Sequence, residues 1–286
     1  MLSILVTGSN GQLGMSIQEI KGQFTENIVF HFTDANELDI SNEKAVRNFF
    51  KNKNYDYCIN CAAYTAVDNA EDNIDLAYAI NADGSKYLAK VCDEYNCIFI
   101  HVSTDFVFDG TKEEPYTTLD QPRPLNIYGA SKLEGERLIQ KVAKKYFIIR
   151  TSWVYSEFGN NFVKTMIKLG KEKDRLDVVS DQIGSPTYAR DLAHFLLKII
   201  LDKNNKYGIY HFSNEGVLSW YDFAQAIIKL SNSDTKVFPV SSSDYKTKAE
   251  RPKFSVMNKD ETITVFNIEL EPWQNSLKTC VRNLNY

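Results

Sequence analysis

The N-terminal segment MLSILVTGSNGQLG restricts the fold more than any other part of this chain, because an apolar strand runs directly into a glycine-rich turn. The glycines Gly8, Gly11 and Gly14 follow the spacing G-x-x-G-x-x-G. Glycine permits a tight turn and a close backbone approach, and the helix that follows presents its positive N-terminal end to an anion. The segment therefore predicts a strand, turn and helix unit that binds the pyrophosphate of a dinucleotide.

Short apolar runs alternate with amphipathic segments, which is typical of a parallel sheet covered by helices. We expect strands at Leu2–Val6, Ile28–Thr33, Tyr57–Asn60, Ile98–Val102, Phe147–Thr151 and Tyr207–Phe212. Helices are expected from about Leu13, from an Asn42 cap to Phe50, and over Ile74–Tyr95, Tyr128–Lys144, Asn161–Lys171, Ala189–Leu201, Ser219–Leu230 and Trp273–Leu284. The predicted fold class is α/β, a Rossmann-type doubly wound parallel sheet with a smaller, discontinuous α/β substrate lobe.

The regular alternation weakens after Thr151, which predicts two structural parts in this chain of 286 residues. We expect residues 1–155 to form the dinucleotide-binding part, with a later segment at about 185–213 returning to it. Residues 156–184 and 214–286 are expected to form the substrate-binding lobe.

Charge and cysteine content argue against several classes of protein. The net charge of −4, with both signs interspersed, offers no broad positive face for nucleic acid. No apolar run approaches the roughly 18 residues that a membrane helix needs. Five cysteines and the lack of an export leader at the start predict a cytoplasmic protein with reduced thiols. The four histidines lack the spacing of metal ligands, so we expect no catalytic metal.

Cofactor contacts are expected where the first three strands end. Asp34 lies 26 residues after Gly8, where a carboxylate accepts hydrogen bonds from the adenosine ribose and repels a 2′-phosphate. An almost equally favoured interpretation is that Asp34 only opens a turn. The choice between NADH and NADPH therefore leans weakly to NADH. Further cofactor contacts are expected from Gln12, Leu13, Asp39, Ile40, Ala62 and Ala63.

Tyr128 and Lys132, in NIYGASKLEGE, are four residues apart and project from one face of a predicted helix. A nearby ammonium favours the anion of a phenol, so Tyr128 is a candidate general acid and base. In isolation such a pair would more often be a surface pair. Thr104, at the end of the strand in HVSTDFVFDG, adds a hydroxyl that can donate to a ketone oxygen, although it can also serve as a turn former or helix cap. The three residues in this order predict a hydride-transfer site.

Seven segments resemble those of the dTDP-4-dehydrorhamnose reductase family, within the extended short-chain dehydrogenase/reductase superfamily: TGSNGQLG, NCAAYTAVDNAE, STDFVFDG, YGASKLEGE, RTSWVYSEFGNNFVKTM, DQIGSPTYARDLA and ERPKFSVMN. The similarity spans nearly the whole chain. It implies reduction of the 4-keto group of dTDP-4-dehydro-L-rhamnose to dTDP-L-rhamnose by NADH or NADPH. Thr104, Tyr128 and Lys132 match the family's catalytic triad, with Tyr128 as the general acid and Lys132 also anchoring the cofactor.

The same resemblance implies a set of substrate contacts: Thr65, Val67, Thr104, Asp105, Trp153, Asn161, Gln182 and Arg251. Trp153 would offer a flat apolar wall to the sugar, or else be a core residue. Arg251 suits a phosphate, or else a structural ion pair. Phe106 stands where the family commonly has a tyrosine, so the hydrogen bond of that phenol is absent.

Other functions fit some of the same features. The chain could reduce another nucleotide-linked keto sugar, because the fold and the triad permit many substrates. It could also be a non-catalytic regulatory subunit like the relative that serves methionine adenosyltransferase. Some relatives form homodimers bridged by magnesium through glutamates, whereas the corresponding helix here carries Arg190, which argues against such a bridge.

Overall fold

The computed structural model describes residues 1–24 and 28–284. Its centre is a six-stranded parallel sheet in the order β10-β5-β4-β3-β1-β2. The strands are β1 (Leu2–Thr7), β2 (Ile28–Thr33), β3 (Tyr57–Asn60), β4 (Ile98–Thr104), β5 (Tyr146–Thr151) and β10 (Gly208–Phe212). The predicted strands and the Rossmann-type fold class are confirmed.

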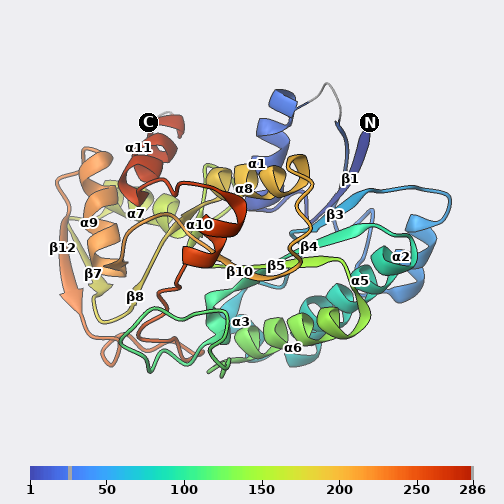
Figure 1. The fold of residues 1–286 in the computed structure, drawn as a ribbon. Helices are drawn as coiled ribbons and strands as arrows, with labels where there is room; N and C mark the ends of the chain where they lie inside the picture. The colour runs from blue at the N-terminus through green and yellow to red at the C-terminus, as the bar shows by residue number, and fades with distance from the viewer. Residues whose placement is uncertain (25–27, 285–286) are drawn as a thin grey trace.

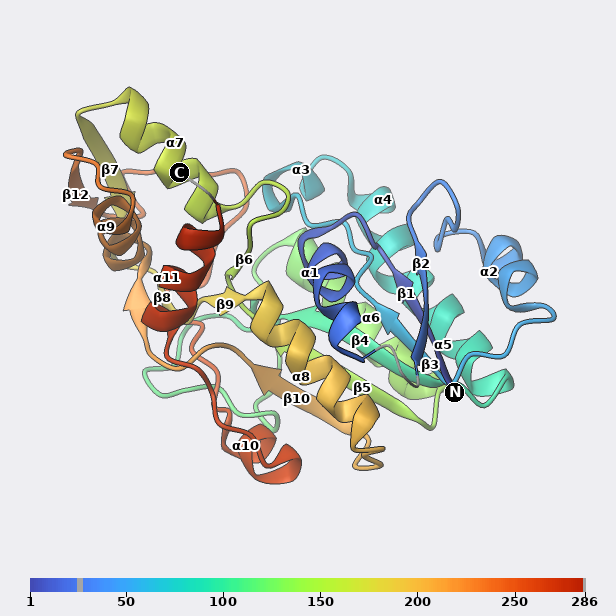
Figure 2. The ribbon, with the colours of Figure 1, turned by 90° about the horizontal axis from the view of Figure 1, so that it is seen from above.

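Helices cover both faces of this sheet (Figures 1 and 2). One face carries α1 (Gln12–Ile20) and α8 (Ala189–Leu201), and the other carries α2 (Glu43–Phe50), α5 (Ser85–Glu94) and α6 (Ile127–Val142). Alternate residues of β1 enter the two cores, since Ile4 and Val6 pack with α1 and α8 whereas Leu5 packs with α2 and α5. Both faces are buried, and the strands therefore read as continuous apolar runs.

The parallel register brings the carboxyl ends of the strands to one edge of the sheet. Thr7 at the end of β1 is level with Asn60 of β3, and Asn60 is level with His101 of β4. Thr104 ends β4 beside Thr151 of β5. The glycine-rich turn and Thr104 therefore open on the same edge, where ligands of doubly wound sheets bind.

A second group of elements lies at one end of the sheet (Figure 1). It contains α7 (Phe162–Glu172), α9 (Trp220–Leu230), α11 (Trp273–Asn283) and the parallel pair β7 (Arg175–Val179) and β12 (Lys236–Val240). Their apolar side chains form a separate core that includes Val163, Ile227 and Leu277. Two-residue strands join the group to the sheet: β6 (Val154–Tyr155) with β9 (Thr187–Tyr188), and β8 (Ile183–Gly184) with β11 (Leu218–Ser219).

Two expectations about helices need correction. The single helix expected over Ile74–Tyr95 is α4 (Ile74–Tyr78), then a π-helical turn over Ala79–Gly84, then α5. Asn81 of this turn accepts a hydrogen bond from Tyr64 N and donates to Ser131 Oγ of α6, and these tertiary contacts accompany the wider turn. The helix α10 (Asp260–Phe266) was not expected, and Phe266 packs in the core of the sheet although it lies within 214–286.

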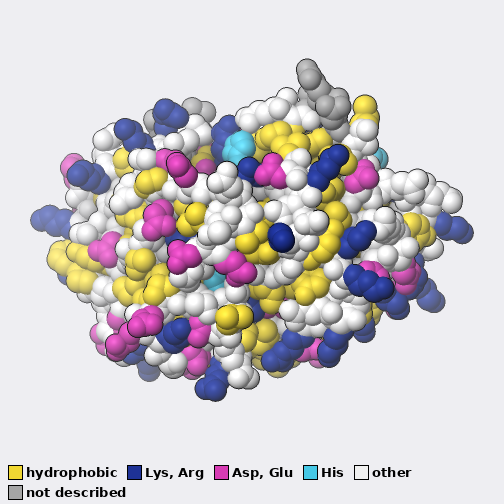
Figure 3. All heavy atoms as spheres, viewed as in Figure 1, with side chains coloured by type: hydrophobic (Ala, Val, Ile, Leu, Met, Phe, Trp, Pro, Cys, Tyr) yellow, Lys and Arg dark blue, Asp and Glu magenta, His cyan; other side chains and the backbone are white. Residues whose placement is uncertain are grey.

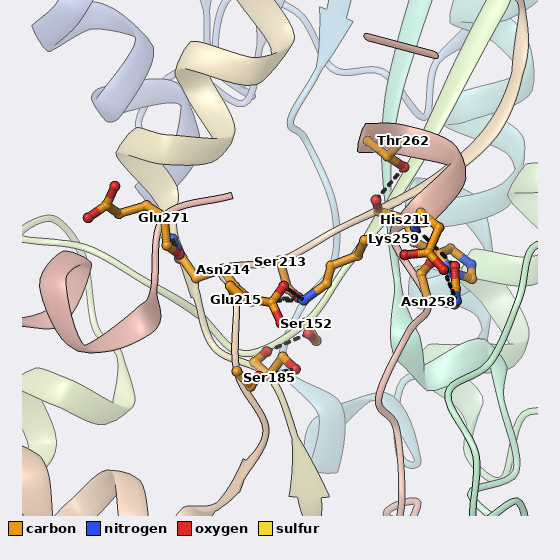
Figure 4. A network of polar contacts seen from close by, with 12 residues as sticks. Ser152, Ser185, His211, Ser213, Asn214, Glu215, Asn258, Lys259, Thr262 and Glu271 are labelled. Atoms are coloured by element: carbon orange, nitrogen blue, oxygen red, sulfur yellow. Dashed lines mark hydrogen bonds and ion pairs between the residues drawn. The ribbon is translucent and has the colours of Figure 1, made fainter. Parts of the chain in front are cut away.

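A buried polar network joins the sheet to the second group (Figure 4). Lys259, just before α10, is 8% exposed and points to Ser213 Oγ, Asn214 O and the carboxylate of Glu215. Asn214 in turn donates to Asp191 of α8 and to Ser276 of α11. The polar residues just after β10 therefore connect the helices α8 and α11 with the segment that leads into α10.

The surface shown in Figure 3 carries Lys, Arg, Asp and Glu side chains in an interspersed pattern. Within residues 1–24 and 28–284, none of the helices has the length and apolar character required to span a bilayer.

Candidate active site

The turn between β1 and α1 is shaped by close backbone contacts. Gly8 has φ +65°, and a Cβ there would lie 2.5 Å from the backbone nitrogen of Ala62. The turn therefore packs directly on the segment that leaves β3, where Ala62 and Ala63 remain predicted cofactor contacts. Gly11 begins α1 without a side-chain cap, which leaves the positive end of the helix to an anion. This arrangement fits the pyrophosphate of a dinucleotide.

Gln12, in the first turn of α1, contacts the second group of elements. Its Oε1 accepts hydrogen bonds from Ser156 Oγ and Asn161 Nδ2. Asn161 also caps α7, because its Oδ1 accepts a hydrogen bond from Lys164 N. Both the nitrogen and the oxygen of its amide therefore have partners. The structure thus places Asn161, a predicted substrate residue, against a predicted cofactor residue. Leu13 is buried in the core.

The acidic residues after β2 make turns. Asp34 accepts hydrogen bonds from Asn10 Nδ2 at 2.6 Å and from Asn36 N at 2.8 Å. Asp39 accepts from the backbone and hydroxyl of Ser41, and Ile40 is 5% exposed in the core. The turn-forming interpretation of Asp34 is therefore realised, and its position at the edge of the sheet beside the glycine-rich turn is also as expected.

Thr104 and Tyr128 come together at the end of β4. A Cβ on Gly129 would lie 2.1 Å from Phe106 O, so glycine is what allows the start of α6 to approach this segment. The Thr104 hydroxyl donates to Asp105 Oδ1 at 3.1 Å and lies near enough to the Tyr128 phenol to act on its pKa. The Phe106 ring meets Tyr128 edge to face at 5.7 Å. A donor hydroxyl and a phenol thus share one site.

Lys132 is 2% exposed and lies deeper, against β4. Its Nζ donates to Val102 O at 2.7 Å and lies 3.1 Å from His101 Nε2. Burial lowers the pKa of Lys132 to about 8, although Glu136 and Cys61 act in the opposite direction.

The phenol of Tyr128 differs from the expectation based on sequence. Lys132 was expected to favour the anion, whereas burial raises the pKa of Tyr128 to about 12, helped by the charge of Asp105 and opposed by Thr104. The reason is that the Lys132 amine is turned to His101 and Val102. Tyr128 is therefore protonated at neutral pH, which suits a proton donor.

Asp105 is 1% exposed, and its Oδ2 makes no hydrogen bond within the described residues. Burial raises the pKa of Asp105 to about 6, while the neighbouring hydroxyls of Ser255 and Thr104 offset part of this effect. An unpaired buried acceptor is costly and is commonly explained by a ligand or a functional role.

A cavity of about 350 Å³ lies between the two groups of elements, and Phe106 forms part of its wall. Trp153 stacks on Trp220 with ring centroids 3.6 Å apart, and both rings line the cavity. Trp153 has φ +48°, a strained conformation for a side chain of this size that is often retained at functional sites. Gln182 and Arg251, also predicted from sequence, line the same cavity.

Arg251 forms an ion pair with Asp68, with Nη2 to Oδ2 at 2.8 Å. The alternative of a structural ion pair is thus present, although Arg251 also faces the cavity. Val67 begins the short helix α3 (Val67–Ala70), and exposed Thr65 precedes it. Both residues come just before Asp68 in the chain, but neither lines the cavity.

Several residues of the site were not found from sequence. Four further residues line the cavity: Trp220, Phe162, Met166 and Tyr245. They lie far from the triad along the chain, and no sequence motif links them to it. His101 did carry one, because a polar residue within the apolar strand IFIHVST must find a partner when it is buried.

The comparisons with known proteins agree along the whole chain. The family model described as RmlD substrate binding domain matches residues 2–286. A protein of Aggregatibacter actinomycetemcomitans named dTDP-4-dehydrorhamnose reductase is 43% identical, over 97% of this chain and 98% of its own. The crystal structure of a Clostridium acetobutylicum protein of that name superposes with a TM-score of 0.94 at 45% identity, covering 100% of both chains. A Bacillus anthracis protein of that name, solved in complex with NADP, has a TM-score of 0.94 at 41% identity, covering 99% of this chain and 100% of its own.

The parallel sheet, the glycine-rich turn and the clustered Thr104 and Tyr128 define a Rossmann-type protein of the short-chain dehydrogenase/reductase superfamily. Within that class, the match over residues 2–286 shows that the chain belongs to the RmlD family.

Proposed function

We propose that this chain reduces the 4-keto group of dTDP-4-dehydro-L-rhamnose to dTDP-L-rhamnose with a nicotinamide cofactor. The observation that carries the proposal is that the Thr104 hydroxyl, at the end of β4, lies near a Tyr128 phenol that is protonated at neutral pH. Relatives that are 41% to 45% identical over almost the full length, and that are named dTDP-4-dehydrorhamnose reductase, support it.

In this proposal the chain's own residues orient the ketone and supply a proton. Tyr128 donates its phenolic proton to the carbonyl oxygen as general acid, and Thr104 donates a hydrogen bond to the same oxygen. The bound nicotinamide supplies the hydride. Lys132, one helical turn after Tyr128, holds the adjacent ribose.

The cofactor is proposed to lie along the edge of the sheet from the glycine-rich turn to Tyr128. Gly8, Gly11 and the start of α1 would hold the pyrophosphate, and Asp34 the adenosine ribose. We propose that either NADH or NADPH serves, with the Asp34 carboxylate favouring NADH.

The substrate is proposed to occupy the cavity beside Trp153 and Trp220. Asp105 would accept a hydrogen bond from a sugar hydroxyl through its unpaired Oδ2, and Arg251 would face the diphosphate. We propose that 156–184 and 214–286 supply the substrate side, while 1–155 and 185–213 bind the cofactor. Thr65, Val67, Asn161 and Gln182 are proposed as the outer boundary.

The test is the absorbance of NADH or NADPH with dTDP-4-dehydro-L-rhamnose generated in situ. Native protein should oxidise the cofactor, and Tyr128→Phe should lower kcat roughly 10²- to 10⁴-fold because the proton donor is lost. Tyr207→Phe, at the amino end of β10 and far from the site, is the matched control and should retain activity. Full activity of Tyr128→Phe would refute the assignment.

The same assay separates the other candidate functions. Turnover of UDP or GDP keto sugars at a higher kcat/KM than the dTDP sugar would favour a different nucleotide-sugar reductase. A folded protein that binds NADH but oxidises it with none of these sugars would favour a regulatory subunit like that of methionine adenosyltransferase.

The choice of cofactor can be tested at one position. Asp34→Ser removes the charge while a hydroxyl can still form the turn. We expect the ratio of kcat/KM for NADPH to that for NADH to rise about tenfold, or about 1.4 kcal/mol. An unchanged ratio would show that Asp34 only shapes the turn.

We propose a cytoplasmic location because all five cysteines are free thiols, as a reducing compartment keeps them. Arg190 pairs with Glu19 of the same chain, so a homodimer is proposed to form without a magnesium bridge at this position.

A further inference from the structure

A second cavity, of about 610 Å³, adjoins the cavity proposed for the sugar. Four residues line both cavities: Gln182, Tyr245, Thr247 and Arg251. The two spaces therefore meet along these residues, and a ligand longer than a sugar could extend from one into the other. The volume of the second cavity is typical of ligand pockets, which measure roughly 300–1,000 Å³.

The walls of the two cavities differ in chemistry. The sugar cavity is lined by the rings of Trp153 and Trp220, among others. Most of the second cavity is lined by the segment 241–253, which contributes the cations Lys246 and Lys253. An apolar cavity beside a more polar one suits a molecule that has a sugar at one end and a nucleotide at the other.

The guanidinium of Arg251, at the boundary, is held from one side. Nη1 donates to Asp68 Oδ1 at 3.1 Å, and Nη2 donates to Asp68 Oδ2 at 2.8 Å. The other hydrogen of Nη1 goes to Ala249 O at 2.9 Å. These bonds use three of the N–H groups of the guanidinium, which has five in total.

The two remaining N–H groups share one edge of the planar guanidinium. Nη2 lies on the same side as the Nε–H, so the outer Nη2–H and the Nε–H point the same way. Among the residues that the structure describes, neither group has a hydrogen-bond partner. Two parallel N–H donors of an arginine match two oxygens of a phosphate.

We propose that Asp68 is a positioning residue, which holds Arg251 so that its free edge binds the diphosphate of a nucleotide sugar, with the sugar in the first cavity and the nucleoside in the second. The class of ligand rests on the proposed function. The ion pair and the bound phosphate are compatible, because they use different edges of one guanidinium.

Asp68 suits this role because it holds the backbone beside Arg251 as well. Its Oδ1 also accepts from Ala249 N at 2.9 Å, so α3 fixes both the segment and the guanidinium. The hydrogen bond from Arg251 lowers the pKa of Asp68, which keeps the carboxylate ionised. Without Asp68, a long and partly exposed arginine would lose its side-chain freedom only when the ligand binds, and affinity would fall.

The negative charge of Asp68 acts in the opposite direction, since it repels a bound anion. The Asp68 side chain is 43% exposed, however, so water and salt screen this repulsion. Positioning should therefore dominate. The two effects can be separated by experiment, because removal of the carboxylate lowers affinity in one case and raises it in the other.

The test is calorimetric titration of the full chain with dTDP alone. Asp68→Ala should weaken binding about tenfold, and Asp68→Asn, which keeps an acceptor oxygen for the guanidinium, should weaken it less. Asp202→Ala removes the carboxylate of an ion pair at the end of α8 and is the matched control, which should bind dTDP as the native protein does. Equal or tighter binding by Asp68→Ala would overturn the proposal.

Arg251→Lys keeps the charge but loses the pair of parallel donors. It should weaken dTDP binding about tenfold and leave the affinity for NADH unchanged, because the dinucleotide is assigned to the glycine-rich turn. The NADH titration also shows that each variant is folded. A loss of NADH affinity with native dTDP affinity would assign Arg251 to the cofactor and overturn the proposal.

Ser243→Trp tests the place of the nucleoside, because an indole at this lining residue would fill part of the second cavity. It should weaken dTDP binding, and native affinity in this variant would contradict the placement. All of these titrations measure binding without turnover. A protein that binds dTDP as expected but reduces no sugar would contradict only the proposed function, whereas turnover together with native dTDP affinity in Asp68→Ala would contradict only this inference.

Discussion

At the scale of single residues, the site combines groups whose ordinary pKa values are all altered by burial. Tyr128 and Asp105 have raised pKa values, and Lys132 has a lowered one. Each shift favours the neutral form, because charge is costly where water is excluded. Tyr128 is therefore neutral at pH 7, whereas Asp105 and Lys132 still carry most of their charge there and titrate closer to neutral pH than in an unfolded chain.

Asp105 makes this cost measurable. Its pKa rises from 3.8 in the unfolded chain to about 6 in the fold, so the folded state binds the proton more tightly. The carboxyl group therefore imposes no cost below pH 3.8, and the free energy of unfolding falls as pH rises through about 6. The total is about 3 kcal/mol, at about 1.4 kcal/mol for each pKa unit.

Asp105→Asn should remove this dependence. Measured by urea unfolding, the variant should gain about 2.4 kcal/mol relative to native protein between pH 4 and pH 7.5, because part of the cost is already present at pH 4. Asp234→Asn, at an exposed position, is the control and should show no such gain. A difference between Asp105→Asn and native protein that is the same at both pH values would contradict the assignment.

At the scale of elements, α6 is the part that assembles the site. It carries Tyr128 and Lys132, and Asn126 caps it by accepting from Gly129 N at 2.8 Å. Its first turn can approach β4 only because Gly129 has no Cβ, and Gly135 likewise lies against Asn81 O of the π-helical turn. The position of the phenol therefore depends on two glycines as well as on the triad itself.

Gly129→Ala should displace the start of α6. The added Cβ would lie 2.1 Å from Phe106 O, and relief of that clash should lower the free energy of unfolding by about 1–3 kcal/mol. The kcat of the proposed reduction should fall because Tyr128 moves away from Thr104. Gly22→Ala, where an added Cβ would meet no described atom within 4 Å, is the control. Unchanged stability and kcat in Gly129→Ala would contradict this role.

Elements that are specified locally could be predicted from the sequence, and those that depend on distant partners could not. The strands of the sheet, the Asn42 cap and α8 follow from periodicity and capping residues, and their bounds agree with the structure. The π-helical turn depends on Asn81 reaching Tyr64 and Ser131. The half-exposed strands β7 and β12 pair across about 60 residues, so neither reads as a strand by itself.

The residues of the candidate site also fall into those that a local sequence pattern predicts and those that depend on distant partners. Thr104 and Tyr128 could be named because strand ends and helix faces are encoded by short motifs, and the structure places the two residues near one another. The Trp153–Trp220 stack and the contact of Lys132 with His101 arise from packing between segments far apart, which no local pattern reports. The raised pKa of Tyr128 could not be predicted either, because burial is a property of the folded chain.

At the scale of the whole molecule, the network around Lys259 holds the two groups of elements together (Figure 4). Lys259→Met would leave Asn214 O and Ser213 Oγ without this donor in a buried place. We expect the free energy of unfolding to fall by about 2 kcal/mol, as for other hydrogen bonds to charged groups.

The measurement is urea unfolding of Lys259→Met beside Lys206→Met, whose side chain is exposed and should be replaced with little effect. If both variants unfold at the same urea concentration, the network does not contribute to stability in this way.

The segment 249–258 closes the cavity from the far end of the chain. Arg251 pairs with Asp68, Ser255 N donates to Ile183 O, and Tyr116 N donates to Val256 O. A ribosome must therefore synthesise almost the entire polypeptide before this pocket can exist, although the sheet's first five strands have long since emerged. A chain that ends before these residues would contain the glycine-rich turn and the sheet but would lack the closed cavity proposed for the sugar.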